Sequence, residues 1–346
     1  MTTSHGTAAG KDAGRELTVT QIAEMAGVSP ATVSKVLNGR PDVGPRTRAV
    51  VEDIISRYGY RRRKKITSPT TPLEVVFHEL AGPYPTAVLS GVHRVAREHR
   101  LAVVLSELQG GHTPAGGWFE DVLMRRPTGV IAVFSDLTET QSRQLRARGI
   151  PLVLVDPTGK TARHAPSVGA SNRAGGLAAT RHLLELGHRR IAIITGPEYA
   201  LSSRTRLEGY RAALRSAGVP VAPELIRVGD FQVEDGVNHT RELLRLPDPP
   251  TAVFACNDGE ALGVYQAAAE AGLRVPDDLS VVGFDDFFPS GWTVPPLTTV
   301  RQPLTEMAAA ATAMVVSLAS GKALARSRVE LATELIVRGS TAPPAR

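Results

Sequence analysis

The apolar positions between Thr18 and Asn38 predict two short helices. Apolar residues recur there three or four positions apart, the spacing that places side chains on one face of a helix. They are predicted to close into a small core: Ile22, Ala26, Val28, Val33, Val36 and Leu37. A third helix is predicted from about Pro45 to Tyr58, with an apolar stripe made of Val51, Ile54, Ile55 and Tyr58. Gly59 marks its end.

The residues that flank the first two helices fit a tight turn between them. Thr18 and Gln21 have the spacing of a capping box, so the first helix is expected to begin with its free N–H groups satisfied. Gly27 falls where the turn needs a positive φ. Ser29 is a good N-cap for the second helix, because its side-chain oxygen can accept from the first free N–H groups. Proline, with no N–H to satisfy, fits the first helical position that follows.

The outer face of the second helix is short, polar or basic. It consists of Pro30, Ala31, Thr32, Ser34, Lys35 and Asn38. Such residues can approach base edges and phosphates closely. The pattern is typical of a helix-turn-helix that enters a DNA groove, and the alternative is an ordinary helical hairpin.

From Leu73 onward, short apolar runs alternate with helical stretches. The predicted strands are 73–77, 102–105, 129–134, 152–155, 191–195, 225–228, 252–255 and 280–284. Helical segments between them include 88–100, 173–186, 206–217 and 262–271. Buried strands that alternate with helices indicate parallel sheets with crossover helices. Eight or more such units are too many for one compact sheet, so the fold class is α/β with two similar lobes behind the helix-turn-helix.

The formal charge separates the N-terminal segment from the rest of the chain. Residues 1–65 hold 12 of the 40 Lys and Arg residues and 6 of the 34 Asp and Glu residues, so the remainder is balanced at 28 each. The run Arg61-Arg62-Arg63-Lys64-Lys65 supplies much of this excess. A basic head on a neutral body is the electrostatic pattern of phosphate binding, whereas the run alone is more often a solvated linker.

Composition sets the remaining limits. With 346 residues, 42% of them hydrophobic, the chain can bury a large core in two or three domains. The single cysteine excludes an internal disulfide framework and fits a reducing cytoplasm. We expect no signal peptide and no membrane span, since no apolar segment of the required kind or length occurs. The segment Thr67–Pro72 reads as an extended linker.

Polar and aromatic residues follow several predicted strands. The polar groups are His78-Glu79, Ser106-Glu107, Asp156, Asn257-Asp258 and Asp285-Asp286, and the candidate aromatic platforms are Phe134, Phe231 and Trp292. Ligands bind beyond the carboxyl ends of parallel strands, where carboxylates and amides can pair with hydroxyls and aromatic faces can cover a sugar ring. Arg204 could donate to two hydroxyls. Taken singly, a strand-end Asp could equally cap a helix, and Phe134 could belong to the core.

Ordered motifs along nearly the whole chain resemble the lactose-repressor/galactose-repressor (LacI/GalR) family of bacterial transcription regulators. The motifs are Val19-Thr20-Gln21-Ile22-Ala23 through Asn38, Leu186-Gly187-His188-Arg189-Arg190-Ile191-Ala192, Arg206-Leu207-Glu208-Gly209-Tyr210, Val281-Val282-Gly283-Phe284-Asp285-Asp286 and Pro296-Leu297-Thr298-Thr299-Val300-Arg301-Gln302-Pro303. The resemblance implies a helix-turn-helix head and a body like a periplasmic sugar-binding protein, with a ligand cleft between two lobes joined by three crossovers. It also implies a cytoplasmic homodimer on a palindromic double-stranded DNA operator, with a small neutral mono- or oligosaccharide as effector.

Carried onto this sequence, the resemblance implies domain boundaries and contact residues. The expected parts are a disordered leader (1–15), the DNA-binding domain (16–60), a basic linker or hinge (61–72) and the body (73–340), with lobe 1 at about 73–165 and 295–328 and lobe 2 at about 166–294 and 329–340. DNA contacts are expected at Thr18, Ser29, Pro30, Ala31, Thr32, Ser34, Lys35, Asn38, Thr47, Tyr60, Arg61 and Arg62. Effector contacts are expected at Glu79, Phe134, Asp156, Arg204, Phe231, Asn257, Asp285 and Gln302.

One segment departs from the family pattern. Relatives follow the tyrosine at Tyr60 with a hinge helix whose leucine wedges into the minor groove, but that position is Pro69 here. We interpret Arg61–Lys65 instead as a basic arm along the minor groove, which neutralises phosphates without reading bases.

Two other functional classes compete with a sugar-responsive repressor of carbohydrate-utilisation genes. A transport-type sugar-binding protein needs an export signal and has no use for a DNA-reading head. A cytosolic sugar-binding module without specific DNA regulation is the remaining alternative. An enzyme is disfavoured, since the chain has no Gly-x-Gly-x-x-Gly motif after a strand, no phosphate-loop lysine motif and no Gly-x-Ser-x-Gly elbow. No catalytic residue, cofactor or metal site is expected, because the nine histidines lack ligand spacing and Cys256 fits a buried filler.

Overall fold

The chain divides into two compact units. The computed structural model describes residues 17–37, 40, 42–58, 71–108, 116–135, 137–158 and 165–345. The first unit extends from Met1 to Pro69 and the second from Thr70 to Arg346. The expected leader at 1–15 and the basic run at 61–65 lie outside the described residues. Within the described ranges, no helix has the length and apolar character needed to cross a bilayer.

The first unit contains the three predicted helices, α1 (Val19–Ala26), α2 (Pro30–Leu37) and α3 (Pro45–Tyr58). Their buried faces meet in one core made of Ile22, Ala23, Val33, Val36, Val43, Val51 and Ile54. Tyr58 differs from the prediction, because its side chain at the end of α3 is exposed. The apolar stripe of α3 therefore ends one turn earlier, at Ile54 and Ile55.

The second unit contains two six-stranded sheets, as expected for two lobes. The first sheet has the order β11-β5-β4-β3-β1-β2, all parallel, with β1 (Leu73–Phe77), β2 (Val103–Glu107), β3 (Gly129–Val133), β4 (Leu152–Val155), β5 (Ser167–Ala170) and β11 (Arg328–Leu331). The second has the order β12-β10-β9-β8-β6-β7, with β6 (Ile191–Thr195), β7 (Ile226–Val228), β8 (Ala252–Ala255), β9 (Ser280–Asp285), β10 (Thr298–Arg301) and β12 (Glu334–Ile336). Only β12 runs antiparallel to its neighbour among these strands.

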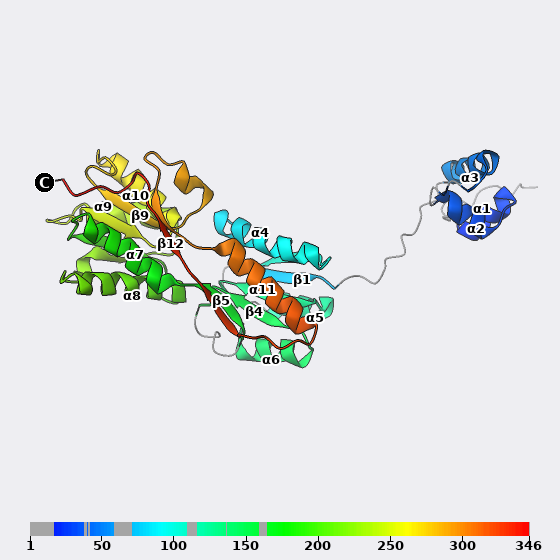
Figure 1. The fold of residues 1–346 in the computed structure, drawn as a ribbon, viewed down its shortest axis with the longest axis horizontal. Coiled ribbons are helices and arrows are strands. Elements are labelled where there is room, and N and C mark those ends of the chain that lie inside the picture. Colours follow the sequence, from blue (N-terminus) through cyan, green and yellow to red (C-terminus); the bar gives the residue numbers. More distant parts are fainter. Residues whose placement is uncertain are drawn as a thin grey trace, which may run out of the picture. The chain divides into compact units, whose positions relative to one another are not determined.

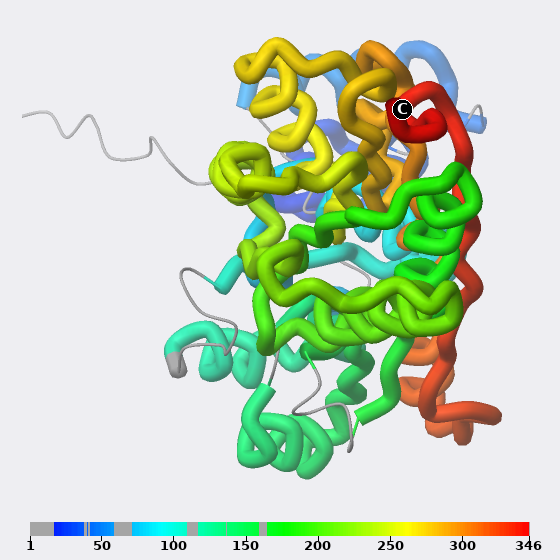
Figure 2. Tube along the Cα trace, turned by 90° about the vertical axis from the view of Figure 1, so that its left-hand side faces the viewer, coloured from blue at the N-terminus to red at the C-terminus, as the bar shows by residue number. Residues whose placement is uncertain are grey.

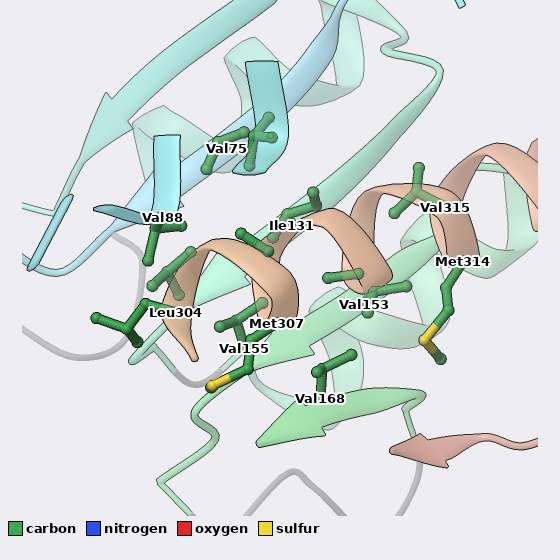
Figure 3. Close-up of a cluster of buried hydrophobic side chains, with 14 of the residues drawn as sticks. Val75, Val88, Ile131, Val153, Val155, Val168, Leu304, Met307, Met314 and Val315 are labelled. Atoms are coloured by element: carbon green, nitrogen blue, oxygen red, sulfur yellow. The ribbon is translucent and has the colours of Figure 1, made fainter. Parts of the chain in front are cut away.

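Helices cover both faces of each sheet (Figure 1). The first sheet packs against α4 (Pro83–Glu98), α5 (Gly116–Arg125), α6 (Glu139–Ala147) and α11 (Leu304–Ala319). The second packs against α7 (Asn172–Glu185), α8 (Leu201–Ser216), α9 (Val233–Leu243) and α10 (Asp258–Glu270), and it carries the short 3-10 helices η1 (Pro223–Leu225) and η2 (Phe288–Gly291). Figure 3 shows α11 packed on the first sheet, with Met307, Met314 and Val315 against strand valines. The buried strands are mostly apolar on both faces, as parallel sheets require, and the buried Glu74 of β1 pairs with Arg125.

The chain passes between the lobes three times, after β5, after β10 and after β11. The expected boundaries at 165/166 and 294/295 were wrong by several residues, since β5 pairs with β4 in the first sheet and β10 pairs with β9 in the second. The boundary at 328/329 was also wrong, because it cuts β11. The physical reason is that strand pairing decides the lobe, and these short strands lack a distinctive apolar run. Figure 2 shows the last passage as the red segment beside both lobes.

Candidate functional site

The helix-turn-helix begins and turns as its sequence predicts. The Thr18 side chain accepts from the Gln21 backbone N–H at 3.3 Å, and the Gln21 side chain accepts from the Thr18 N–H, which completes the capping box. Gly27 has φ +63° at the end of α1, a conformation that favours glycine. Ser29 caps α2 by accepting from the Thr32 backbone N–H at 3.1 Å. The orientation of α2 is thus held by local hydrogen bonds.

The two faces of α2 differ in burial. Val33 and Val36 point into the core, whereas Pro30, Ala31, Ser34 and Lys35 are exposed and Thr32 is half-buried. Thr18, at the start of α1, is also exposed, and Thr47 on α3 is half-buried. Asn38, Tyr60, Arg61 and Arg62 lie outside the described residues.

An acidic side chain lies beside the basic group of this exposed face. The Lys35 ammonium contacts the Asp42 carboxylate at 2.7 Å, and both side chains are about half exposed. The hydrogen bond from Lys35 lowers the pKa of Asp42, so this carboxylate is ionised at neutral pH. The exposed face of α2 therefore presents a paired cation.

The second unit holds a cavity of about 370 Å³ between its two lobes. Its lining comes from the carboxyl ends of β1, β3, β4 and β9, from the segments that follow β7 and β8, and from α4 and α8. This is the position at which open parallel sheets bind ligands.

Several residues that line the cavity have unusual backbone conformations. Phe134, Asp156, Phe231 and Asp285 have φ values of +48°, +47°, +64° and +113°. A positive φ costs a non-glycine residue free energy, and such residues cluster at functional sites where the surrounding fold holds them. Here each lies at or just beyond the end of a strand, and the bend aims its side chain into the cavity.

Aromatic rings from both lobes line one side of the cavity. The Phe134 ring lies 6.2 Å from the Tyr199 ring and 6.1 Å from the Phe231 ring, measured between centroids. On another side, the Tyr84 ring of lobe 1 meets the Phe287 ring of lobe 2 edge-on at 6.5 Å. Aromatic faces of this kind suit the apolar C–H surface of a ring-shaped ligand.

A chain of hydrogen bonds crosses the cavity floor. Tyr84 donates its hydroxyl to Oδ2 of Asp156 at 2.8 Å, and the Gln302 amide donates to the same oxygen at 3.3 Å. The Gln302 carbonyl oxygen accepts from Nη2 of Arg206 at 2.8 Å. Burial raises the pKa of Asp156, and burial together with this carboxylate raises the pKa of Tyr84.

Arg206 is the central cation of the cavity. Its guanidinium carbon lies 3.6 Å from the centroid of the Phe284 ring, which supports it from behind. Its Nη2 lies 3.8 Å from Oδ1 of Asp285, and burial raises the pKa of that carboxyl strongly although Arg206 opposes the shift. Arg206 and Asp285 together offer a donor and an acceptor to one ligand.

Most of the predicted effector residues come together here. Glu79, Phe134, Asp156, Phe231, Asn257 and Asp285 line the cavity, while Gln302 lies behind it and holds Asp156 and Arg206. The Asn257 side chain also caps α10, accepting from the Glu260 N–H at 2.7 Å and donating to the Phe231 carbonyl.

The prediction for Arg204 was wrong. Arg204 is exposed and does not line the cavity, because α8 begins at Leu201, five residues before the predicted start. Arg204 lies within this helix, where its guanidinium donates to the Glu198 and Tyr199 carbonyls of lobe 2 and to the Thr158 carbonyl of lobe 1. Arg206 occupies the buried face, on which Ser202, Ser203, Gly209 and Tyr210 also lie. Helical spacing across 202–210 was the signal that could have identified it.

Other cavity residues had weaker signals. Tyr84 and Tyr199 line the cavity but were not predicted, since neither follows a strand directly. The prediction of Trp292 as an aromatic platform was wrong, because its side chain is 74% exposed beside Phe288 and does not line the cavity.

The single cysteine is buried, as expected for a core residue, and burial raises the pKa of the Cys256 thiol. Within the described part of the chain, no group of three or more His, Cys, Asp or Glu side chains is placed to hold a metal ion.

Asp258 gives a pH-dependence that can be measured. This buried carboxyl accepts from the Phe287 N–H and from the Ser290 and Thr299 hydroxyls, yet burial raises its pKa from 3.8 to about 6. Since the folded-state pKa exceeds the unfolded value, Asp258 stabilises the fold fully below pH 3.8 and loses that contribution as pH rises through 6. We expect Asp258→Asn to remove this slope, worth roughly 2 kcal/mol between pH 4 and 7.

Urea unfolding of the wild-type protein and of the Asp258→Asn variant across pH 4–7 checks the expectation. Buried histidines such as His188, whose pKa burial lowers, change stability in the opposite direction and affect both proteins equally. A difference between the two proteins that does not change with pH contradicts the assignment.

Comparisons with known proteins agree over most of the chain. A family model described as bacterial regulatory proteins, lacI family, matches residues 18–63, and one described as a periplasmic binding protein-like domain matches residues 180–341. The ribose operon repressor of Escherichia coli K12 is 33% identical over 335 residues, covering 93% of this chain and 99% of the relative. The transcriptional regulator CelR of Thermobifida fusca is 34% identical over 339 residues, covering 94% and 98%.

Solved structures give the same result. A CelR–cellobiose complex matches with a TM-score of 0.72 at 33% identity, covering 94% of this chain and all of that one. The Lac repressor dimer bound to operator and the anti-inducer ONPF matches with a TM-score of 0.73 at 29% identity, covering 95% and 100%. These relatives are transcription regulators. The match to their helix-turn-helix excludes the alternative hypothesis that the chain is a sugar-binding module without a DNA-binding function. The chain belongs to the LacI/GalR family of DNA-binding transcription regulators.

Proposed function

We propose that this protein is a cytoplasmic repressor of carbohydrate-utilisation genes whose operator affinity is set by a neutral sugar bound between its lobes. The observation that carries the proposal is the pairing, in one chain, of a helix-turn-helix head with a separate cavity lined by aromatic rings and carboxylates. An effector changes DNA affinity only by binding the two states of the body unequally, and such coupling is typically about 1–3 kcal/mol.

In the proposed DNA complex, α2 enters the major groove. The contact residues are Thr18, Ser29, Pro30, Ala31, Thr32, Ser34, Lys35 and Thr47, with Asn38, Tyr60, Arg61 and Arg62 outside the described part of the chain. Pro30 and Ala31 have no hydrogen-bonding side chains, so they discriminate through apolar contact with a thymine methyl or through DNA shape. A homodimer places two heads on half-sites roughly one helical turn apart.

Footprinting on the DNA upstream of the protein's own gene tests this part of the proposal. Protection of two inverted half-sites, centred roughly 34 Å or a multiple of that apart, is expected. A single unpaired protected site contradicts the dimeric arrangement, and uniform weak protection contradicts sequence-specific binding.

Asp42 is expected to restrain DNA binding. Because it neutralises Lys35 on the exposed face of α2, Asp42→Asn should free that ammonium and remove a negative charge near the phosphates. We expect operator affinity at fixed salt to rise several-fold and the salt slope to steepen by up to about one ion per head.

Asp53→Asn is the matched control for this variant. Asp53 pairs with Arg57 within α3 at 2.9 Å, so the control makes the same charge change in the same unit away from α2. Fluorescence anisotropy against salt concentration measures both variants. An equal rise in affinity in the two would mean that net charge alone is responsible.

The cavity chemistry supports a neutral ligand with several hydroxyls. Its lining includes five carboxyl groups, Glu79, Asp156, Asp230, Asp258 and Asp285, but only one guanidinium, Arg206. Carboxyl groups exchange hydrogen bonds with hydroxyls, and those that are ionised repel phosphates. The Phe134 and Phe231 rings can cover an apolar sugar face. The proposed contacts are Glu79, Phe134, Asp156, Arg206, Phe231, Asn257 and Asp285, with Gln302 holding Asp156 and Arg206.

The relatives narrow the ligands to be tested. One is a ribose repressor and another has been solved with cellobiose. A cavity of about 370 Å³ is large enough for a disaccharide. We propose a pentose or a short xylo- or gluco-oligosaccharide.

Calorimetric titration with ribose, xylose, cellobiose, xylobiose and glucose 6-phosphate tests the ligand class. Binding of a neutral sugar without binding of the phosphate is expected. Binding of glucose 6-phosphate alone contradicts the proposal. We also propose that the protein does not turn its ligand over, since its single thiol, Cys256, is fully buried. A sugar recovered chemically changed after incubation contradicts this.

A further inference from the structure

Two amide side chains stand where the chain passes between the lobes. Asn172 follows β5 on the first passage, and Gln302 follows β10 on the second. Both are buried, and Asn172 does not line the cavity. Any effect of Asn172 on a bound ligand must therefore pass through another residue.

Each amide connects lobe 1 to the same guanidinium in lobe 2. The Asn172 amide nitrogen donates to the carbonyl of Ala170, in the first sheet, at 3.1 Å, and its oxygen accepts from Nε of Arg206 at 2.8 Å. Gln302 likewise donates to Asp156 in lobe 1 and accepts from Nη2 of Arg206. Arg206 thus bonds to both of these interlobe passages.

Close helix packing brings Arg206 to this position. Gly176 of α7 lies against the Arg206 backbone of α8, where an added Cβ would stand 2.3 Å from the Arg206 carbonyl oxygen. The first turn of α7, which begins at Asn172, is therefore held against the middle of α8. The remaining terminal nitrogen, Nη1, donates to the carbonyl of Cys256 at the end of β8. The guanidinium thereby links α8, the second sheet and two passages.

We propose that Asn172 is a positioning residue that couples the ligand cavity to the movement of the lobes through Arg206. This inference rests on the proposed function, in which a sugar changes operator affinity. A ligand that draws the guanidinium toward Asp285 pulls on Asn172, and Asn172 transmits that pull to Ala170 and the end of β5. The amide is suited to this role because it accepts from Arg206 and donates to Ala170 at the same time, which neither aspartate nor alanine can do.

Two substitutions at this position separate the two bonds. Asn172→Ala removes both, so we expect sugar affinity to fall roughly tenfold or more, as for a lost hydrogen bond to a charged group, and the sugar's effect on operator affinity to shrink. Asn172→Asp keeps an acceptor for Arg206 but cannot donate to Ala170. We expect it to bind sugar within about threefold of wild type while its operator response at saturating sugar is reduced.

Thr333→Val is the matched control on the third passage. Its hydroxyl bonds only to the Ser171 carbonyl, at 3.4 Å, and it does not contact Arg206. The probe is the sugar that binds most tightly among ribose, xylose, cellobiose and xylobiose. Calorimetry measures its affinity for each variant, and operator anisotropy measures how much it changes operator affinity. The proposal is supported if Thr333→Val keeps a sugar affinity and an operator response close to those of wild type while the two Asn172 variants behave as described above.

Three outcomes overturn it. The first is an Asn172→Ala variant whose sugar affinity and operator response change no more than those of Thr333→Val. The second is an Asn172→Asp variant whose operator response to sugar equals that of wild type, which removes the proposed link to lobe 1. The third is that both Asn172 variants fail to bind the operator even in the absence of sugar, which shows that Asn172 has a structural role only. A wild-type protein whose operator affinity changes with none of the four sugars overturns the proposed function itself, which distinguishes that failure from the others.

Discussion

Replacing Arg206 with methionine is expected to weaken sugar binding by about 100-fold or more and to abolish the sugar's effect on DNA affinity. Methionine retains much of the side-chain volume but leaves Asn172, Gln302 and the Cys256 carbonyl without their shared donor. It also leaves Asp285 without its neighbouring cation. Stability should fall by roughly 3–5 kcal/mol, which protonation of the carboxyls partly offsets.

Arg204→Met is the matched control. It removes the same charge two residues away on α8, but from an exposed side chain that does not line the cavity. Sugar affinity within about twofold of wild type is expected. Calorimetry measures the sugar affinity of both variants, and thermal unfolding with operator binding in the absence of sugar confirms that each is folded. Loss of sugar binding in Arg204→Met with retention in Arg206→Met contradicts the site described above.

Replacing Val33 with aspartate is expected to abolish operator binding and leave sugar binding unchanged. Val33 is fully buried at the centre of the helix-turn-helix core. An unpaired carboxylate there costs several kcal/mol, which is comparable to the whole stability of a domain of this size. Because the head and the body are separate compact units, the cavity should be unaffected.

Met25→Asp places the same charge on an exposed position of α1 and should leave the head folded. Anisotropy and calorimetry on each variant give the two affinities. Operator binding by Val33→Asp within tenfold of wild type contradicts the proposed fold of the head, and loss of its sugar binding contradicts the independence of the two units.

The head was predictable because its determinants are local. Capping by Thr18 and Ser29, the positive φ of Gly27 and the spacing of Val33 and Val36 all act within a few residues. No long-range contact has to be known to place these side chains. The exposed Tyr58 is the exception, since the end of an apolar stripe depends on what packs against it.

In the body, apolar strands such as β1 and β6 were predicted well because parallel strands are apolar on both faces. The short strands β5, β10, β11 and β12 were missed since only pairing distinguishes them from loops. The helix α11 was missed because it is apolar almost all round, which hides the helical period.

The cavity was predicted in its parts but not in its connections. Strand ends identified Asp156 and Asp285, because position alone places them at the sheet edge. The bond from Tyr84 to Asp156 joins residues 72 apart, and those from Asn172 and Gln302 to Arg206 join residues 34 and 96 apart. Such contacts depend on helix packing and on the lobe passages, and the error at Arg204 arose from the same dependence.

Operator anisotropy with and without sugar measures whether ligand binding in the body changes DNA binding by the head. A labelled palindrome from the DNA upstream of the gene is titrated with the protein at fixed salt, alone and with each sugar at saturation. We expect tight, salt-sensitive binding whose affinity one neutral sugar shifts by roughly 5- to 150-fold. Tight binding that no sugar moves, although calorimetry shows a sugar bound, would contradict this expectation.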